Sequence, residues 1–89
     1  MTEENTINLL KNVGLFEVSQ ITSFECYRKA KDGTTQKVIV EILDAGIDVN
    51  PELRYQCEAR TKDGKIATGN PASSIDDVIS TVHWYDLDR

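Results

Sequence analysis

The chain has 89 residues, of which 39% are hydrophobic and 28% are charged, and ten Lys and Arg against fifteen Asp and Glu give a formal net charge of −5. A length well below about 150 residues predicts one domain over residues 1–89, and the hydrophobic content excludes a disordered chain. The acidic balance argues against a dedicated nucleic-acid-binding protein, because such proteins gain most of their affinity by neutralising phosphates with Lys and Arg.

The first residues predict a short helix over roughly residues 3–12. Thr2 can cap the helix, and the acidic residues that follow it suit the positive end of the helix dipole. Ile7 and Leu10 lie at i, i+3 spacing and form a narrow apolar stripe. Gly14 supplies the stop, because glycine adopts the left-handed conformation that ends many helices.

From residue 15 to residue 68 the pattern changes to strands and turns. Asp32 and Gly33 separate two strand-like runs and predict a hairpin turn, because both residue types tolerate a positive φ. The second run, residues 37–43, is the most β-prone segment of the chain. Its apolar residues fall on both parities, which predicts a central strand covered at least in part on both faces.

Residues 44–52 predict a loop or wide turn, because they include Gly46 and Pro51. Residues 53–60 then alternate between apolar and polar side chains, which is typical of a half-buried strand. Asp63 and Gly64 predict a second hairpin turn, and a short strand follows at residues 66–68.

The last segment carries the strongest helical pattern of the chain. Ser74 can cap the helix, and Asp77 completes a capping box three residues later. Apolar residues at i, i+3, i+4 and i+7 form one stripe, which consists of Ile75, Val78, Ile79 and Val82. Tyr85 extends this face, so the pattern predicts a helix over residues 75–85.

Together these elements predict an α+β fold. Its antiparallel sheet has three or four strands, and an N-terminal and a C-terminal helix pack on one face of the sheet. An acidic, polar start differs from the basic and then apolar start of a secretory signal, and no stretch is long and apolar enough for a membrane span. We therefore expect a cytoplasmic protein without membrane contact, in which Cys26 and Cys57 remain thiols.

We find no motif for a catalytic, cofactor or metal site and expect none of the three. Two cysteines and one histidine cannot make a four-ligand zinc site on their own. His83 near Asp86 could act as an acid or base, but a solvent-facing His83 is the simpler interpretation. Cys26 and Cys57 fall on the apolar parity of their strands, which favours buried, inert thiols over nucleophiles.

Several large apolar residues exceed what one covered sheet face needs. These are candidates for contact with a protein partner or for self-association, and they are Trp84, Tyr27, Ile39 and Leu43. The favoured interpretation is a small non-catalytic domain that acts through protein contact or assembly. Trp84, near the end of the predicted helix, could anchor a partner, since tryptophan is enriched among the residues that dominate interface energetics.

The alternative is weak nucleic-acid binding through the two hairpins, which are locally basic although the chain is acidic. The candidate contacts are Arg28, Lys29, Lys31, Arg60, Lys62 and Lys65. Lysines near strand edges also discourage edge-to-edge aggregation, so the same residues have a structural explanation.

The order helix, three strands, helix in so short a chain resembles the double-stranded-RNA-binding domain over most of its length. That resemblance implies recognition of duplex RNA by shape and phosphate contact, with basic residues at the start of the last helix. Here residues 72–77 contain Asp76 and Asp77 and no Lys or Arg, so the resemblance carries the fold and not the function. Residues 68–71, with the capped helix and residues 83–88, are also similar to small uncharacterised bacterial proteins, a similarity that implies no function.

Overall fold

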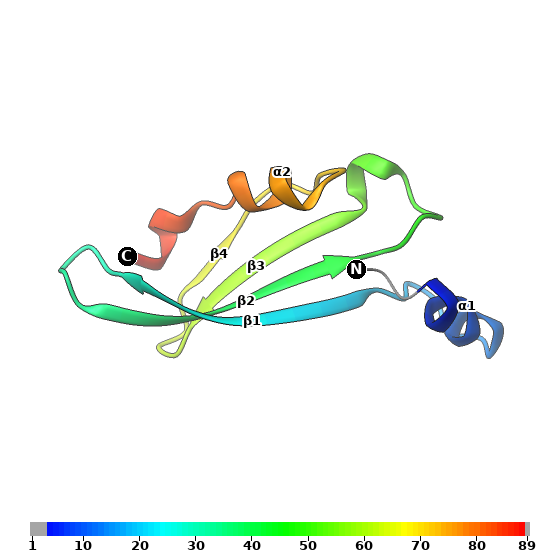
Figure 1. Cartoon of the computed structure of the whole chain (residues 1–89), viewed down its shortest axis with the longest axis horizontal. Coiled ribbons are helices and arrows are strands. Elements are labelled where there is room, and N and C mark those ends of the chain that lie inside the picture. Colours follow the sequence, from blue (N-terminus) through cyan, green and yellow to red (C-terminus); the bar gives the residue numbers. More distant parts are fainter. Residues whose placement is uncertain (1–3, 89) are drawn as a thin grey trace.

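A computed structural model describes residues 4–88 and consists of one antiparallel sheet with helical segments at both ends of the chain (Figure 1). In chain order the elements are α1 (Glu4–Asn12), β1 (Gln20–Lys29), β2 (Thr35–Asp44), the 3-10 turn η1 (Pro51–Leu53), β3 (Tyr55–Thr61), β4 (Ile66–Thr68), α2 (Ile75–Ser80) and the 3-10 turn η2 (Trp84–Asp88). The predicted α+β class with an open antiparallel sheet and a helix toward each end is confirmed.

The four strands follow one another in the order β1-β2-β3-β4, and each pairs antiparallel with the next. Both predicted hairpin turns are present, and Gly33 and Gly64 have φ values of 87° and 91° that the turns require. Residues 37–43 lie in β2 between β1 and β3, so the prediction of a central strand is confirmed. The sheet is asymmetric, because edge strand β1 has ten residues and edge strand β4 has three.

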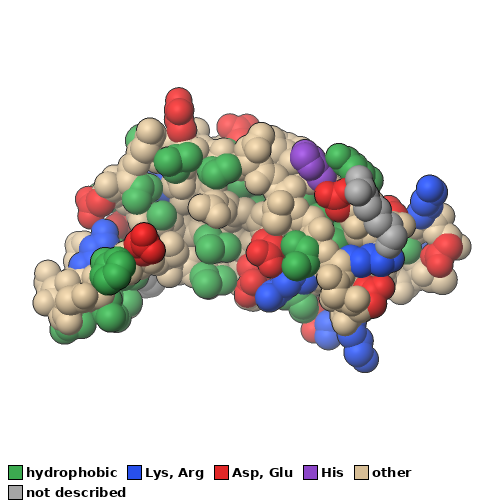
Figure 2. All heavy atoms as spheres, turned by 180° about the vertical axis from the view of Figure 1, so that it is seen from behind, with side chains coloured by type: hydrophobic (Ala, Val, Ile, Leu, Met, Phe, Trp, Pro, Cys, Tyr) green, Lys and Arg blue, Asp and Glu red, His purple; other side chains and the backbone are tan. Residues whose placement is uncertain are grey.

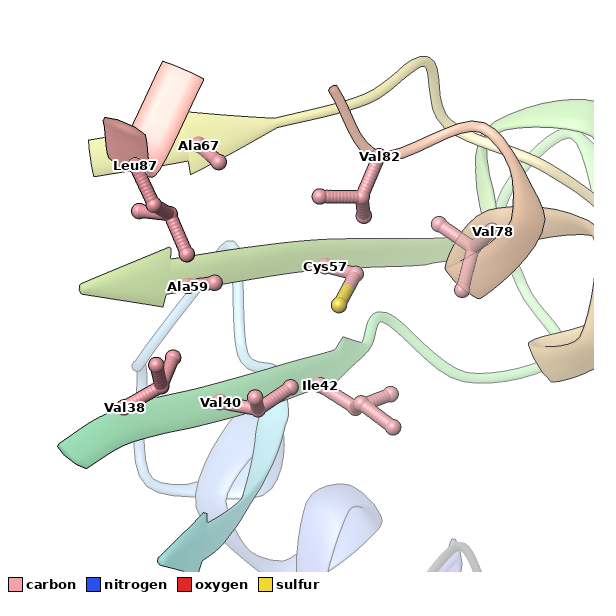
Figure 3. Packing of buried hydrophobic residues seen from close by; sticks show 9 residues of the cluster. All are labelled: Val38, Val40, Ile42, Cys57, Ala59, Ala67, Val78, Val82 and Leu87. Atoms are coloured by element: carbon pink, nitrogen blue, oxygen red, sulfur yellow. The ribbon is translucent and has the colours of Figure 1, made fainter. Parts of the chain in front are cut away.

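The hydrophobic core lies between one face of the sheet and a layer formed by α2 and η2 (Figure 3). Small side chains on the two strands below this layer, Cys57, Ala59 and Ala67, allow the helical segments to approach closely. Val78 and Leu87 fill the resulting space and are fully buried. The remaining core residues are Val38, Val40, Ile42 and Val82.

The C-terminal helix is shorter than the predicted span of residues 75–85. It ends at Ser80, and a separate 3-10 turn begins at Trp84. The hydroxyls of Ser80 and Thr81 donate to carbonyls three residues earlier, while the His83 N–H donates to the Thr68 carbonyl of β4. The chain therefore lies against the sheet edge at this point. This contact with β4 ends the helix, although the apolar spacing of the sequence continues beyond Ser80.

A close contact between two segments favours the same break. A Cβ atom at Gly69 would lie 2.7 Å from the backbone carbonyl carbon and oxygen of Thr81. Only glycine allows this approach, and the approach brings residues 81–83 against the end of β4. Beyond the break, Tyr85 is exposed and Leu87 replaces it in the core.

Helix α1 lies beyond one end of the sheet, whereas α2 and η2 cover a sheet face (Figure 1). The expected placement of both helices on one face is thus refined: only the C-terminal segments form that layer. Buried Ile7 of α1 lies near Gly46, and Glu4 lies 3.7 Å from Arg54. Arg54 in turn holds Asp44 with hydrogen bonds of 2.9 and 3.3 Å.

Candidate functional site

One concave surface is an apolar groove between β1 and the helical layer. It encloses about 420 Å³. Strands β1 and β2 form its floor, while α2 and η2 form its opposite wall. The lining residues, which we call the β1 groove, are Thr22, Phe24, Cys26, Val40, Ile42, Ile75, Ile79 and Trp84.

The groove exists because the helical layer covers β3 and β4 but does not extend over β1. Helix α2 has six residues and packs on β3, while η2 packs on β4 and β3. The side chains of β1 on the same sheet face are therefore left without a helix above them. Val40 and Ile42 at the base of the groove belong to the buried core, so the groove is continuous with the hydrophobic interior.

The rim of the groove exposes large apolar side chains. Phe24 is 49% exposed, and Ile75 and Ile79 are 39% and 38% exposed across from it. Trp84 is half-buried and packs against the core, so it is a wall of the groove and not a free anchor. Figure 2 shows hydrophobic side chains at the surface in the middle of the molecule and around α1.

The other predicted partner contacts lie on the opposite face of the sheet. Register places Tyr27, Ile39 and Leu43 there, away from Trp84. Tyr27 is 63% exposed, whereas Ile39 and Leu43 are half-buried. The four candidates therefore do not form one surface.

Charged pairs interrupt that opposite face. Lys37 lies 2.9 Å from Glu25, and Arg60 lies 2.9 Å from Glu41. Ile39 stands between these two pairs, since Glu25 and Arg60 are its partners on the neighbouring strands. This face is consequently mixed in character, and the contiguous apolar surface is on the helical side.

Three of the six basic hairpin residues pair with carboxylates. Arg28 donates to both oxygens of Asp88 at 3.0 Å, Arg60 pairs with Glu41, and Lys65 lies 3.8 Å from Asp63. Figure 2 shows acidic and basic side chains next to one another at the end of the molecule away from α1.

The two hairpin turns do lie side by side at that end of the sheet. They share a hollow lined by Lys31 and Lys65 together with three acids, Asp32, Asp63 and Asp88. Lys29 and Lys62 are exposed beside it. The two basic turns are therefore adjacent in space, but the acids that line the hollow between them outnumber its lysines.

His83 and the thiols occupy separate environments. His83 is exposed and its ring stacks on Tyr85 with a centroid distance of 5.6 Å. Burial raises the pKa of the Cys57 thiol, which disfavours the reactive thiolate. Cys26 is half-buried in the β1 groove. Within residues 4–88, no three His, Cys, Asp or Glu side chains form a group that could hold a metal ion.

Comparison with known proteins gives no relative: no family model, no curated protein and no solved structure matches the chain. The helix, strands, helix order behind the resemblance to the double-stranded-RNA-binding domain is present, with a fourth strand added. Among the described residues, no helix has the length and apolarity needed to cross a membrane.

The β1 groove contains residues that sequence reasoning did not assign to a site. Ile75 and Ile79 belong to the apolar stripe predicted for the last helix, and the sequence singles out no role for Phe24. No sequence signal identifies them, because the pattern predicts a helix over residues 75–85 and the observed helix has only six residues. Only Val78 of that helix is buried.

Proposed function

We propose that this protein is a small non-catalytic module that acts through contact with another protein surface, and that the β1 side of the molecule is the contact surface. The observation that carries the proposal is the β1 groove with its exposed rim. Exposed apolar surface that is continuous with a core is typical of protein interaction sites in soluble domains.

The position of the groove supports a protein occupant. Its floor reaches the outermost strand, so a partner could pair with the backbone of β1 and place side chains above Phe24 at the same time. The opposite sheet face offers a less continuous apolar surface to a partner, because ion pairs lie between its apolar residues. The proposal includes a cytoplasmic location, in which Cys26 and Cys57 stay thiols.

Site-specific photo-crosslinking tests the proposal. A benzophenone amino acid replaces Phe24 in one variant and Ile66, an exposed residue at the opposite sheet edge, in the control. Irradiation of cells that produce the protein should give a discrete protein adduct at position 24 several times more strongly than at position 66. Equal yields at the two positions, or no adduct at position 24, would contradict the proposal.

Weak nucleic-acid binding is the second candidate, and the adjacent hairpin turns are the observation that favours it. The ion pairs of Arg28, Arg60 and Lys65 weigh against it, because paired cations release fewer counterions from phosphates. Kinship with the double-stranded-RNA-binding domain is weakened further by Asp76 and Asp77, which occupy the first turn of α2.

A further inference from the structure

We propose that the partner of the β1 side is a second copy of the chain, and that β1 of each copy pairs antiparallel across a two-fold axis. The two four-stranded sheets then form one continuous sheet. This inference rests on the proposed function and names the partner for the same surface.

The backbone of β1 offers a regular row of donors and acceptors at its free edge. The Ala30 N–H donates to the Thr34 carbonyl, so even-numbered residues face β2. Hydrogen-bonded and non-hydrogen-bonded positions alternate in an antiparallel ladder. The outward groups therefore belong to the odd-numbered residues Ile21, Ser23, Glu25, Tyr27 and Lys29.

Over residues 20–28 this edge lacks the usual protection against pairing, and its one lysine, Lys29, is the last residue of the strand. All ten residues keep an unbroken register with β2, so no bulge twists the edge away, and the strand contains no proline. Its only cation on the groove side, Arg28, is held by Asp88. Long, regular and unprotected edge strands are templates for another strand.

Symmetry restricts the register. Residues that face the free edge must pair with residues that face it in the second copy, and only two registers then overlap nine of the ten residues of β1. In one, the axis passes through Glu25, which places two carboxylates directly opposite each other. In the other it passes through Phe24, and residues 20–28 of each copy overlap without a directly opposed pair of like charges.

The Phe24-centred register matches side chains on both faces. On the groove side, Phe24 of each copy meets its counterpart at the axis, and Thr22 lies opposite Cys26 of the second copy. On the other face, Ile21 lies opposite Tyr27, and Ser23 lies opposite Glu25. Aromatic and aliphatic cross-strand pairs of this kind stabilise sheets, and Lys37 balances each Glu25 charge.

The amount of exposed surface fits such a contact. The chain has 6189 Å² of accessible surface, roughly 900 Å² more than a compact monomer of 10.0 kDa. A standard interface buries about 800 Å² on each partner. In the Phe24-centred register the hairpin turn of the second copy also lies alongside residues 13–19, where Val13, Leu15 and Phe16 are exposed.

Proline substitutions at the two sheet edges test the pairing. Ser23→Pro removes an outward N–H of β1 and no backbone hydrogen bond to β2. It also removes one long, exposed hydrogen bond of 3.4 Å, from the Ser23 hydroxyl to the Glu41 carboxylate, so the protomer should keep its fold. Ile66→Pro is the matched control on β4, where Ala67 faces β3 and Ile66 faces outward. Sedimentation of the wild type should give twice 10.0 kDa, as should Ile66→Pro.

Ser23→Pro should raise the dimer dissociation constant at least about 100-fold with an unchanged circular dichroism spectrum. A wild type that stays monomeric up to millimolar concentration would overturn the proposal. So would a dimer in which Ser23→Pro dissociates no more readily than Ile66→Pro.

Disulfide trapping tests the register in which the two β1 strands pair. With diamide as oxidant, Thr22→Cys should crosslink to Cys26 of the second copy, because directly opposed residues of a non-hydrogen-bonded pair have Cα atoms about 4.5 Å apart. Ser23→Cys, whose side chain is on the other face, should form no intermolecular disulfide. A crosslink of Cys26 to Cys26 in the wild type, or of Ser23→Cys to itself, would overturn the Phe24-centred register.

The oligomeric state and the crosslinking result together distinguish a failure of the dimer proposal from a failure of the proposed function. A strictly monomeric protein that still gives a position-24 adduct of unlike mass contradicts the dimer and supports a different protein partner. Absence of any position-24 adduct contradicts both.

Discussion

At the scale of single residues, one ion pair fastens the end of the chain to the first hairpin. Arg28 donates to both oxygens of Asp88, and the Lys31 N–H donates to the same carboxylate at 2.9 Å. These hydrogen bonds lower the pKa of Asp88 to about 2. Because Asp88 follows Leu87, the pair also holds the most deeply buried leucine in place.

The lowered pKa predicts a pH-dependent contribution to stability. The carboxyl is more acidic in the folded than in the unfolded chain, so its contribution is present above about pH 4 and is lost as the pH falls toward 2. Urea unfolding of wild type, Arg28→Gln, Asp88→Asn and the double variant should give a coupling between the two residues at pH 6 that is strongly reduced at about pH 2. Equal coupling at both pH values would contradict this assignment.

At the candidate site, the sequence predicted which residues are apolar but not where Trp84 and Phe24 lie relative to the helical layer. The sequence makes Trp84 a candidate partner contact, and in the structure η2 places it in a wall of the groove. The sequence gives no role to Phe24, because a strand pattern shows which side chains share a face and not whether a helix covers them. The extent of that cover depends on where α2 ends, and a tertiary contact sets that point.

At the scale of elements, α2 is a six-residue helix that depends on its cap. Helices this short are unstable alone, and the Ser74 hydroxyl accepts a hydrogen bond from the Asp77 N–H at 3.2 Å, as the capping box predicted. The cap therefore stabilises the wall of the β1 groove as well as the helix.

Removal of the cap should have a measurable cost. Ser74→Ala should lower the free energy of unfolding by about 0.5–2 kcal/mol, measured by chemical denaturation. Ser73→Ala, one residue earlier and exposed, is the matched control and should change it little. An equal loss in both variants would show that the hydroxyl of Ser74 does not act as the cap.

Local signals account for the elements that the sequence predicted well. The turns at Gly33 and Gly64, the cap at Ser74 and the alternation of β3 each depend on a few neighbouring residues. The break after Ser80 depends on Gly69, which is distant in sequence. The position of α1 likewise depends on Arg54 and Asp44, a pair that no periodicity reveals.

At the scale of the whole molecule, the fold is long and thin. Its principal extents are 49 × 22 × 18 Å and its radius of gyration is 14.9 Å, against about 12 Å for a compact domain of this length. A sheet covered on one face only, together with a projecting α1, produces this shape. Such a form leaves more surface in contact with solvent than the small core requires.

The net charge of −5 and the paired hairpin cations predict weak affinity for nucleic acid. Fluorescence anisotropy with single- and double-stranded RNA should show a dissociation constant above about 100 µM at physiological salt. Tight binding at physiological salt that falls steeply with added salt would instead favour the second candidate function. Substitution of the two exposed lysines, Lys29→Ala with Lys62→Ala, would then have to reduce it.

The shortness of β4 determines the stoichiometry of any assembly built on the sheet. At that edge the Thr68 carbonyl already accepts a hydrogen bond from His83, and three residues offer too little backbone for stable pairing. Each copy thus has one edge that can accept a strand and one that cannot. Growth must end after a single addition, so association through β1 saturates at two chains and cannot propagate into a fibril.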